Sequence, residues 1–318
     1  MHTLTRRAVL AGTTTFAIAA QAEDRPLRIV LGYPAGASSD TITRLIADKM
    51  RVSLDRSVVV ENKPGANGIV ANLAVKTAAP DGSTLLMTPL ATMVAFPHSY
   101  AKLDYDPFKD YVPVAHVAAF QIAFGVGADV PARTLAEYVA LAKKGGRYTN
   151  FASAAAGSLP HFFGLLFGKT AGLELVHVPY KGTAQVLQAL IAGEIPAAVL
   201  PIADLGTLVQ SGKGRILATA GARRAPQYPD VPTFKESGYD IEGSAWYALF
   251  APAGTPKDIV DKIAAAAIDA VRQPDLRQKI EPLGLEATGY GPDALAKIMK
   301  DDDAKWGPVI RASGFKAD

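Results

Sequence analysis

Short runs of apolar and β-branched residues recur along the chain and alternate with segments of helical periodicity, and this alternation constrains the fold most strongly. It is typical of α/β proteins with largely parallel sheets, because a helix must connect each strand to the next parallel one. With 318 residues, 49% of them hydrophobic, the chain can form one large domain or two lobes. The expected strands are at 27–31, 58–60, 85–88, 114–117, 122–126, 176–178, 197–200, 216–220 and 246–251.

The middle of the chain is predicted to form a separate lobe. Two adjacent strands within residues 114–126 are joined only by residues 118–121, and a turn-rich segment, GARRAPQYPDVPT, follows the strand that ends at residue 220. A chain that crosses near residue 119 and returns near residue 221 builds two mixed sheets connected by paired hinge strands, with a cleft between them. The expected division is 23–120 plus 222–318 for a discontinuous first lobe and 121–221 for the second.

The N-terminus has the features of an export signal over residues 1–22. Arg6 and Arg7 precede an apolar run at 8–20, and Ala20-Gln21-Ala22 is a small-x-small cleavage site. The apolar run is shorter than the roughly 18 residues that a membrane-spanning helix needs. We therefore expect a periplasmic protein; the paired arginines favour the twin-arginine route and leave the ordinary secretory route open.

The charge balance gives no sign of a nucleic-acid partner. The first 22 residues contain two arginines and no acidic residue, so 31 of the 33 lysines and arginines remain against 30 acidic residues. No basic run exceeds two residues, and no basic patch is interleaved with aromatic residues. The chain has no cysteine, which excludes disulfides, thiol nucleophiles and cysteine-bound metals.

Four expected strands run into loops of small residues that open helices. The loops lie at 32–39 and 88–92 in the first lobe and at 152–158 and 179–183 in the second. Each can present backbone N–H groups, reinforced by the helix dipole, to a negative charge without a cationic side chain. Gly36, Gly157 and Gly182, in three of these loops, let a ligand approach the backbone closely. Two such lobes facing one cleft suit a small molecule with an anionic group at each end, most simply a carboxylate.

Catalytic and metal-binding patterns are weak. Ser158, His161 and a distant aspartate form a conceivable hydrolytic triad, but no G-x-S-x-G elbow surrounds the serine. The acidic run at 301–303 lies between apolar residues at helical spacing and is expected on a solvated helix face. We predict no catalytic residue, no metal and no cofactor. The histidines that lack metal-binding spacing are His98, His116, His161 and His177.

Several motifs occur in a specific order over almost the whole mature chain. They are YPAGASSD at 33–40, VENKPG at 60–65, APDG at 79–82, AGS at 156–158 with His161, VPYKG at 178–182, DVPTF at 230–234, WY at 246–247 and APAGTP at 251–256. In this order and spacing they resemble the substrate-binding proteins of tripartite tricarboxylate transporters, often called Bug or TctC-like proteins.

The resemblance implies a two-lobed periplasmic binding protein of type II that closes like a flytrap over a small carboxylate and performs no catalysis. It also implies that the loops at 33–39 and 156–158 face the ligand from opposite lobes. Asp40 is expected to stabilise a helix N-terminus rather than contact the anion. The implied ligand-binding residues are Tyr33, Ala35, Gly36, Ala37, Ser38, Gly157, Ser158 and His161, followed by Thr88, Tyr180, Lys181 and Gly182.

The chain also departs from the family pattern. Ala37 replaces a common glycine, and Pro196 and Leu200 replace acidic residues found in many relatives. A pocket without those carboxylates offers less to an ammonium group, which predicts an amine-free ligand: a di- or tricarboxylate, or an aromatic acid against Leu200 and Tyr180. The expected partner is the membrane permease of a tripartite tricarboxylate transporter, with a periplasmic signalling partner as the alternative. We expect the protein itself to be a monomer.

Overall fold

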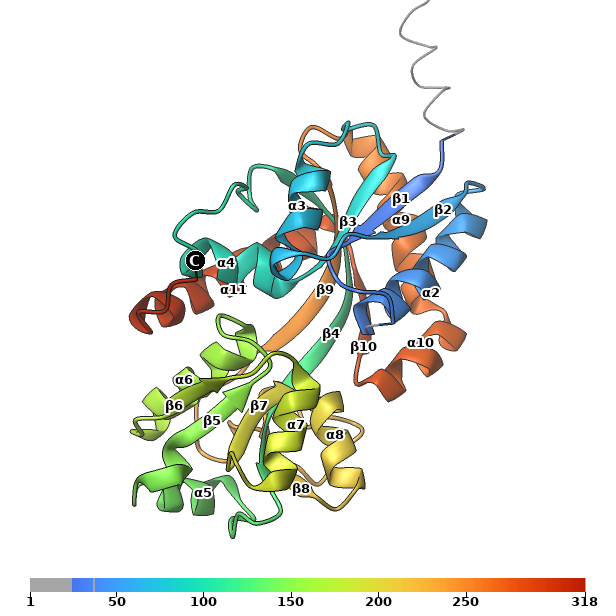
Figure 1. Cartoon of the computed structure of the whole chain (residues 1–318). Coiled ribbons are helices and arrows are strands. Elements are labelled where there is room, and N and C mark those ends of the chain that lie inside the picture. The colour runs from blue at the N-terminus through green and yellow to red at the C-terminus, as the bar shows by residue number, and fades with distance from the viewer. Residues whose placement is uncertain (1–24, 37, 318) are drawn as a thin grey trace, which may run out of the picture.

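The computed structural model describes residues 25–36 and 38–317, which form two lobes connected by long strands (Figure 1). The predicted export signal and Ala37 lie outside the described residues. The first lobe contains β1 (Leu27–Leu31), β2 (Val58–Asn62), β3 (Thr84–Pro89), β9 (Ser244–Pro252), β10 (Glu286–Tyr290) and the first part of β4 (Tyr111–Gly127). The second lobe contains β5 (Asn150–Ser153), β6 (Val176–Pro179), β7 (Ala197–Pro201), β8 (Gly214–Thr219) and the second part of β4.

Helices cover both faces of each sheet (Figure 1). Those of the first lobe are α2 (Ser38–Ser53), α3 (Ile69–Lys76), α4 (Phe96–Ser99), α9 (Lys257–Arg272), α10 (Pro274–Ile280) and α11 (Pro292–Ala312). Those of the second lobe are α5 (Leu135–Ala142), α6 (Leu159–Ala171), α7 (Thr183–Ala192) and α8 (Ile202–Gln210). Short helical turns occur at η1 (Ala66–Gly68), η2 (Ala91–Ala95), η3 (Gly146–Thr149) and η4 (Glu281–Leu283).

The strand directions bring the loops of the two lobes face to face. In the first lobe the order is β2-β1-β3-β9-β4; β1 is parallel to β2 and β3, and β9 is antiparallel to β3 and β4. Strand β3 therefore runs in the direction of β4, toward the second lobe. There the order is β4-β7-β5-β6, and β7 runs antiparallel to β4 and parallel to β5, back toward the first lobe. The carboxyl ends of both strand sets consequently border the space between the lobes, where α/β proteins bind ligands.

Strand β4 is continuous through the predicted connection at 118–121, which corrects the expectation of two short strands. Ala118, Ala119, Phe120 and Gln121 pair with β9, and the residues from Ile122 onward pair with β7 and β8. Alanine and glutamine have low strand propensity, so these residues resemble a break in the sequence; pairing with β9 overrides that local preference. β4 and β9 are thus the paired hinge strands, and both sheets are mixed.

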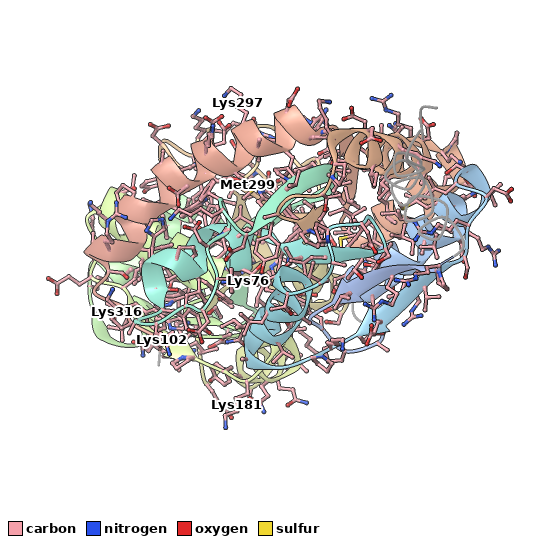
Figure 2. The ribbon with its side chains drawn as sticks, turned by 90° about the horizontal axis from the view of Figure 1, so that it is seen from above. Lys76, Lys102, Lys181, Lys297, Met299 and Lys316 are labelled. Atoms are coloured by element: carbon pink, nitrogen blue, oxygen red, sulfur yellow. The ribbon has the colours of Figure 1, made fainter. Side chains whose placement is uncertain are left out.

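Two cores lie on opposite faces of the first sheet, as alternation along β1 requires. Ile29 points toward α2 and α9, whereas Val30 points toward α3 and α11. The second of these cores continues into the next lobe, where Trp306 of α11 packs on Phe163 of α6 with ring centroids 4.6 Å apart. Figure 2 shows Lys297 on the outer side of α11 and Met299 beneath it. Helix α11 therefore fastens the two lobes together along one side.

The acidic run on α11 is only partly solvated, contrary to the expectation for residues 301–303. Asp302 Oδ2 accepts a hydrogen bond from Trp246 Nε1 at 2.8 Å, and burial raises the pKa of Asp302 to about 6. Asp303 Oδ1 lies 2.7 Å from His98 Nε2. The predicted helix is present, but the carboxylates of Asp302 and Asp303 contact side chains of the first lobe.

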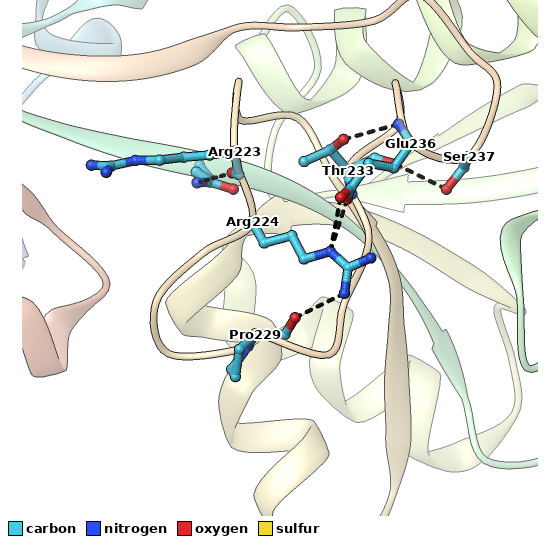
Figure 3. A network of polar contacts seen from close by, with 7 residues as sticks. Arg223, Arg224, Pro229, Thr233, Glu236 and Ser237 are labelled. Atoms are coloured by element: carbon cyan, nitrogen blue, oxygen red, sulfur yellow. Dashed lines mark hydrogen bonds and ion pairs between the residues drawn. The ribbon is translucent and has the colours of Figure 1, made fainter.

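The segment between β8 and β9 packs on the second lobe. The ring of Phe234 lies 5.3 Å from that of Phe167 on α6. Figure 3 shows Arg224 Nε donating to both carboxylate oxygens of Glu236, at 3.0 and 2.9 Å, which closes the segment on itself. The predicted lobe boundaries stay a prediction; we propose that the return crossing lies nearer Gly243 than residue 221.

Candidate ligand-binding site between the lobes

The β1–α2 loop is anchored by a buried aspartate. Gly36 has a φ of +86°, and its N–H donates to Asp40 Oδ2 at 2.9 Å. Asn62 Nδ2 and Arg44 Nη2 each reach Asp40 Oδ1 at 2.9 Å. These contacts, above all the hydrogen bond from Arg44, lower the pKa of Asp40 to about 2. Asp40 thus fixes the loop, while Ala35, Gly36 and Ser38 remain exposed at the N-terminus of α2.

Two further predicted binding residues of the first lobe are Tyr33, which follows β1, and Thr88, near the end of β3. Tyr33 is half-buried and its hydroxyl donates to Asn67 O at 3.3 Å; burial, followed by Tyr247 and Tyr100 nearby, raises its pKa. Thr88 is only 2% exposed, and its hydroxyl lies 2.6 Å from that of Thr92. Tyr33 is therefore partly accessible, whereas Thr88 belongs to a hydrogen-bonded layer of the first-lobe core.

The β5–α6 loop is held by Ser158 and His161. Ser158 is the N-cap of α6: its Oγ accepts from His161 N at 3.4 Å and donates to Ala155 O at 2.7 Å. The ring of His161 accepts the N–H of buried Gly157 through Nδ1 at 3.1 Å. The Gly157 N–H therefore already has a partner, and Nδ1 of His161 is not placed to activate the Ser158 hydroxyl.

His161 and His177 stack with ring centroids 3.9 Å apart. Burial lowers the pKa of His161 to about 4, and burial together with His161 lowers that of His177 to about 3. Both rings are neutral at neutral pH and bring no positive charge to a bound anion. Across residues 25–36 and 38–317, no group of three or more His, Asp or Glu residues is suited to a metal ion.

The β6–α7 loop and β7 contribute less to the cleft than predicted. Gly182 has a φ of +101°, and its N–H donates a hydrogen bond to Ala154 O at 2.8 Å. Lys181 is exposed, and Figure 2 shows it at the edge of the molecule. Leu200 is 0% exposed inside the core beneath α7 and α8, and Tyr180 packs half-buried against that core. The proposed contact of an aromatic ligand with Leu200 therefore lacks an accessible surface.

A cavity of about 630 Å³ lies between the lobes beside the hinge. None of the predicted binding residues that the structure describes lines it. Arg223 and Glu286 close its outer side through a 2.6 Å contact between Nη2 and Oε1. Other lining residues are Phe120 and Gln121 of β4, Ile202 of α8 and Leu285. Phe120 connects the cavity to the cleft wall, because its ring lies 5.1 Å from that of Tyr247 on β9.

Asp204 was missed by sequence reasoning. It lies in the first turn of α8, and its Oδ2 accepts a hydrogen bond from Thr183 Oγ1 at 3.2 Å. Burial raises the pKa of Asp204, and its charge adds to the burial that raises the pKa of Tyr247. An acidic residue in a first helical turn ordinarily indicates only a helix-dipole contact, so the sequence carried no signal of this position.

The fold and the cleft define a class of protein, the two-lobed periplasmic solute-binding proteins. The family to which the chain belongs is that of the tripartite tricarboxylate transporter receptors, because the family model described as "Tripartite tricarboxylate transporter family receptor" matches residues 42–315. Members of this family bind solutes and are not enzymes. This confirms the predicted family and the predicted two-lobed fold. Within the part of the chain that the structure describes, no helix is both long and apolar enough to cross a membrane.

Three solved structures illustrate the likeness. The periplasmic binding protein BugD is 29% identical, with a TM-score of 0.78 over 92% of this chain and 99% of that one. MatC from Rhodopseudomonas palustris, solved with bound malate, is 32% identical, with a TM-score of 0.77 over 90% and 99% of the two chains. A second R. palustris protein, Rpa4515 with adipate, is 27% identical, with a TM-score of 0.81 over 92% and 98%.

Proposed function

We propose that the protein captures a small carboxylate between its lobes and delivers it to the membrane subunits of a tripartite tricarboxylate-type transporter. The observation that carries this proposal is the shared fold with relatives solved with malate and adipate. A di- or tricarboxylate is the favoured ligand class, since the buried position of Leu200 removes the surface on which an aromatic acid would pack.

Backbone groups supply the attraction for the anion. Helices α2, α6, α7 and α8 begin at strand ends that border the space between the lobes, so their first-turn N–H groups and dipoles favour negative charge there. The nearby histidines are neutral and Lys181 faces outward. Recognition through backbone donors makes selectivity depend on the length and shape of the acid. The ligand then stabilises the closed state only to the extent that it binds this state more tightly than the open one.

The test is a binding titration on protein purified from the periplasm, with malate, succinate, adipate, citrate and benzoate. Ala35→Asp puts a negative charge on the exposed β1–α2 loop and should weaken carboxylate binding at least tenfold. Ala265→Asp, at an exposed position of α9, is the matched control and should bind normally. Failure of every acid to bind the unmutated protein, by calorimetry and by a shift in Tm, would reject the proposal.

The transporter partnership needs a separate measurement. Deleting the chain from its native cell should abolish high-affinity uptake of the acid identified by titration, and returning it should restore uptake. Normal uptake combined with a lost transcriptional response to the acid would favour the signalling alternative.

A further inference from the structure

Asp204 is a half-buried acid at the junction of the lobes. It lies on α8 directly after Ile202, which lines the hinge cavity, and Ala203, which touches the first lobe. A Cβ atom added to Gly284 of the first lobe would lie 2.6 Å from Cβ of Ala203. The start of α8 therefore meets the opposite lobe at Ala203, and Asp204 is the next residue in the first turn of the same helix.

The carboxylate of Asp204 has only one partner among the described residues. Thr183 donates to Oδ2, and no lysine, arginine or histidine of residues 25–36 and 38–317 forms an ion pair with Asp204. Oδ1 accepts no hydrogen bond from these residues, and it is not among the fully buried unpaired atoms, so it remains reachable. A half-buried carboxylate without a cation is costly unless a donor completes its hydrogen bonding.

Arg223 and Arg277 line the hinge cavity, but neither forms an ion pair with Asp204 among the described contacts. Tyr247 of β9 is close enough for the charge of Asp204 to affect its phenol, and Tyr33 lies beside Tyr247. In the open cleft water can hydrogen-bond Oδ1, and a donor on a molecule bound between the lobes can take its place. A second carboxylate placed at Asp204 would be repelled, whereas an ammonium or hydroxyl group would complete the site.

We propose that Asp204 determines ligand specificity by accepting a hydrogen bond from an ammonium or hydroxyl group on the bound carboxylate. This inference rests on the proposed function and narrows its substrate class to hydroxy or amino acids with one or more carboxylates. It also revises the expectation of an amine-free ligand. Pro196 and Leu200 do remove two acidic positions of the family pattern, but Asp204, four residues after Leu200 and in the first turn of α8, supplies an acid.

Ligands that differ only in the donor test the proposal. Succinate, malate and aspartate share a four-carbon dicarboxylate skeleton. Succinate carries no additional donor, malate carries a hydroxyl group and aspartate carries an ammonium group. The purified protein should bind malate or aspartate at least tenfold more tightly than succinate, the size expected for one hydrogen bond to a charged group. Preference for aspartate over malate identifies the donor as ammonium, and the reverse identifies it as hydroxyl.

Asp204→Asn keeps the shape of the side chain and removes its charge, so it should reduce the preference for the donor-bearing acid to about threefold or less while succinate binding stays the same or improves. Asp293→Asn removes an exposed first-turn acid from α11 and should leave the preference unchanged. Thr183→Val removes the hydrogen bond to Asp204 but keeps its charge, so this variant should retain the preference. It provides a second measurement if Asp204→Asn does not fold.

Equal affinities for the three acids, or an unchanged preference in folded Asp204→Asn, would overturn the role of Asp204 while carboxylate binding stands. Absence of binding by any acid would overturn both this inference and the proposed function.

Discussion

The ring of Phe315 covers the α-carbon of Gly157: a Cβ atom on this glycine would lie 2.7 Å from Cε1 of the ring. The same ring lies edge-on to His161, with centroids 5.2 Å apart. Two residues later, Ala317 N donates to Ser99 O of the first lobe at 2.7 Å. The C-terminal tail therefore ties the β5–α6 loop of the second lobe to the first lobe, next to the residues predicted to bind ligand.

Gly157→Ala should be markedly destabilising. A φ of +73° costs an alanine about 1–2 kcal/mol, and the added methyl group must also displace Phe315. We expect the free energy of unfolding, measured with urea, to fall by about 2–3 kcal/mol. Gly172→Ala is the matched control, since its φ is +64° and nothing lies within 4 Å of the new methyl group. Equal losses in both variants would show that the ring contact contributes nothing.

Phe315→Ala should loosen the connection between the lobes. Phe315 is only half-buried, so the expected loss in unfolding free energy is about 1–2 kcal/mol, below the roughly 3–5 kcal/mol of a fully buried phenylalanine. Amide exchange of residues 157–162 should accelerate as well. Phe108→Ala, at a phenylalanine that is 45% exposed, should change stability by less than about 0.5 kcal/mol. Unchanged exchange in Phe315→Ala would contradict the tie.

The sequence predicted the class of fold because strand and helix periodicities are local. It failed at residues 118–121, where the strand exists only through pairing with β9. It also missed β10, whose EATGY sequence contains Gly289 and pairs irregularly with β4. Both errors concern segments that depend on partners far away in the chain.

The sequence places the candidate loops at strand ends, and their contact with ligand stays a prediction; it does not reveal the directions of the side chains. Buried strands are apolar on both faces, so the pattern alone does not tell which residues point toward a cleft. Thr88 and Leu200 lie at strand ends as expected, yet both side chains enter the cores. Asp204 and Tyr247 come from different lobes, and the charge of Asp204 reaches the phenol of Tyr247 only when the chain folds, which no motif spacing encodes.

The stacked histidines should make the protein sensitive to mild acid. The pKa values of His161 and His177, about 4 and about 3, lie below the ordinary value of 6.5. Below pH 6.5 the unfolded chain therefore binds protons that the folded chain does not, and the free energy of unfolding falls as the pH drops toward 4. Each ring accounts for about 2 kcal/mol, so we expect the two to contribute a loss of about 4–5 kcal/mol between pH 7 and pH 4.5. Urea denaturation at several pH values measures it, and His177→Gln should make the dependence shallower; an identical slope would contradict this assignment.

Asp40 should also destabilise the protein on acidification, but over a lower pH range. Its folded pKa of about 2 lies below the ordinary value of 3.8, so its ionised form stabilises the protein above pH 3.8, and this contribution is lost as the pH falls toward 2. Asp40→Asn should cost about 1–2 kcal/mol at pH 7 and little near pH 2, because Arg44 loses its ion pair and the Gly36 N–H loses a charged acceptor.

Ligand affinity of Asp40→Asn should fall too if the β1–α2 loop contacts the bound acid. Asp48→Asn, at an exposed position of the same helix, should alter neither quantity. A stability loss with normal affinity would remove this loop from the binding site, while normal stability would show that the buried contacts of Asp40 do not anchor it.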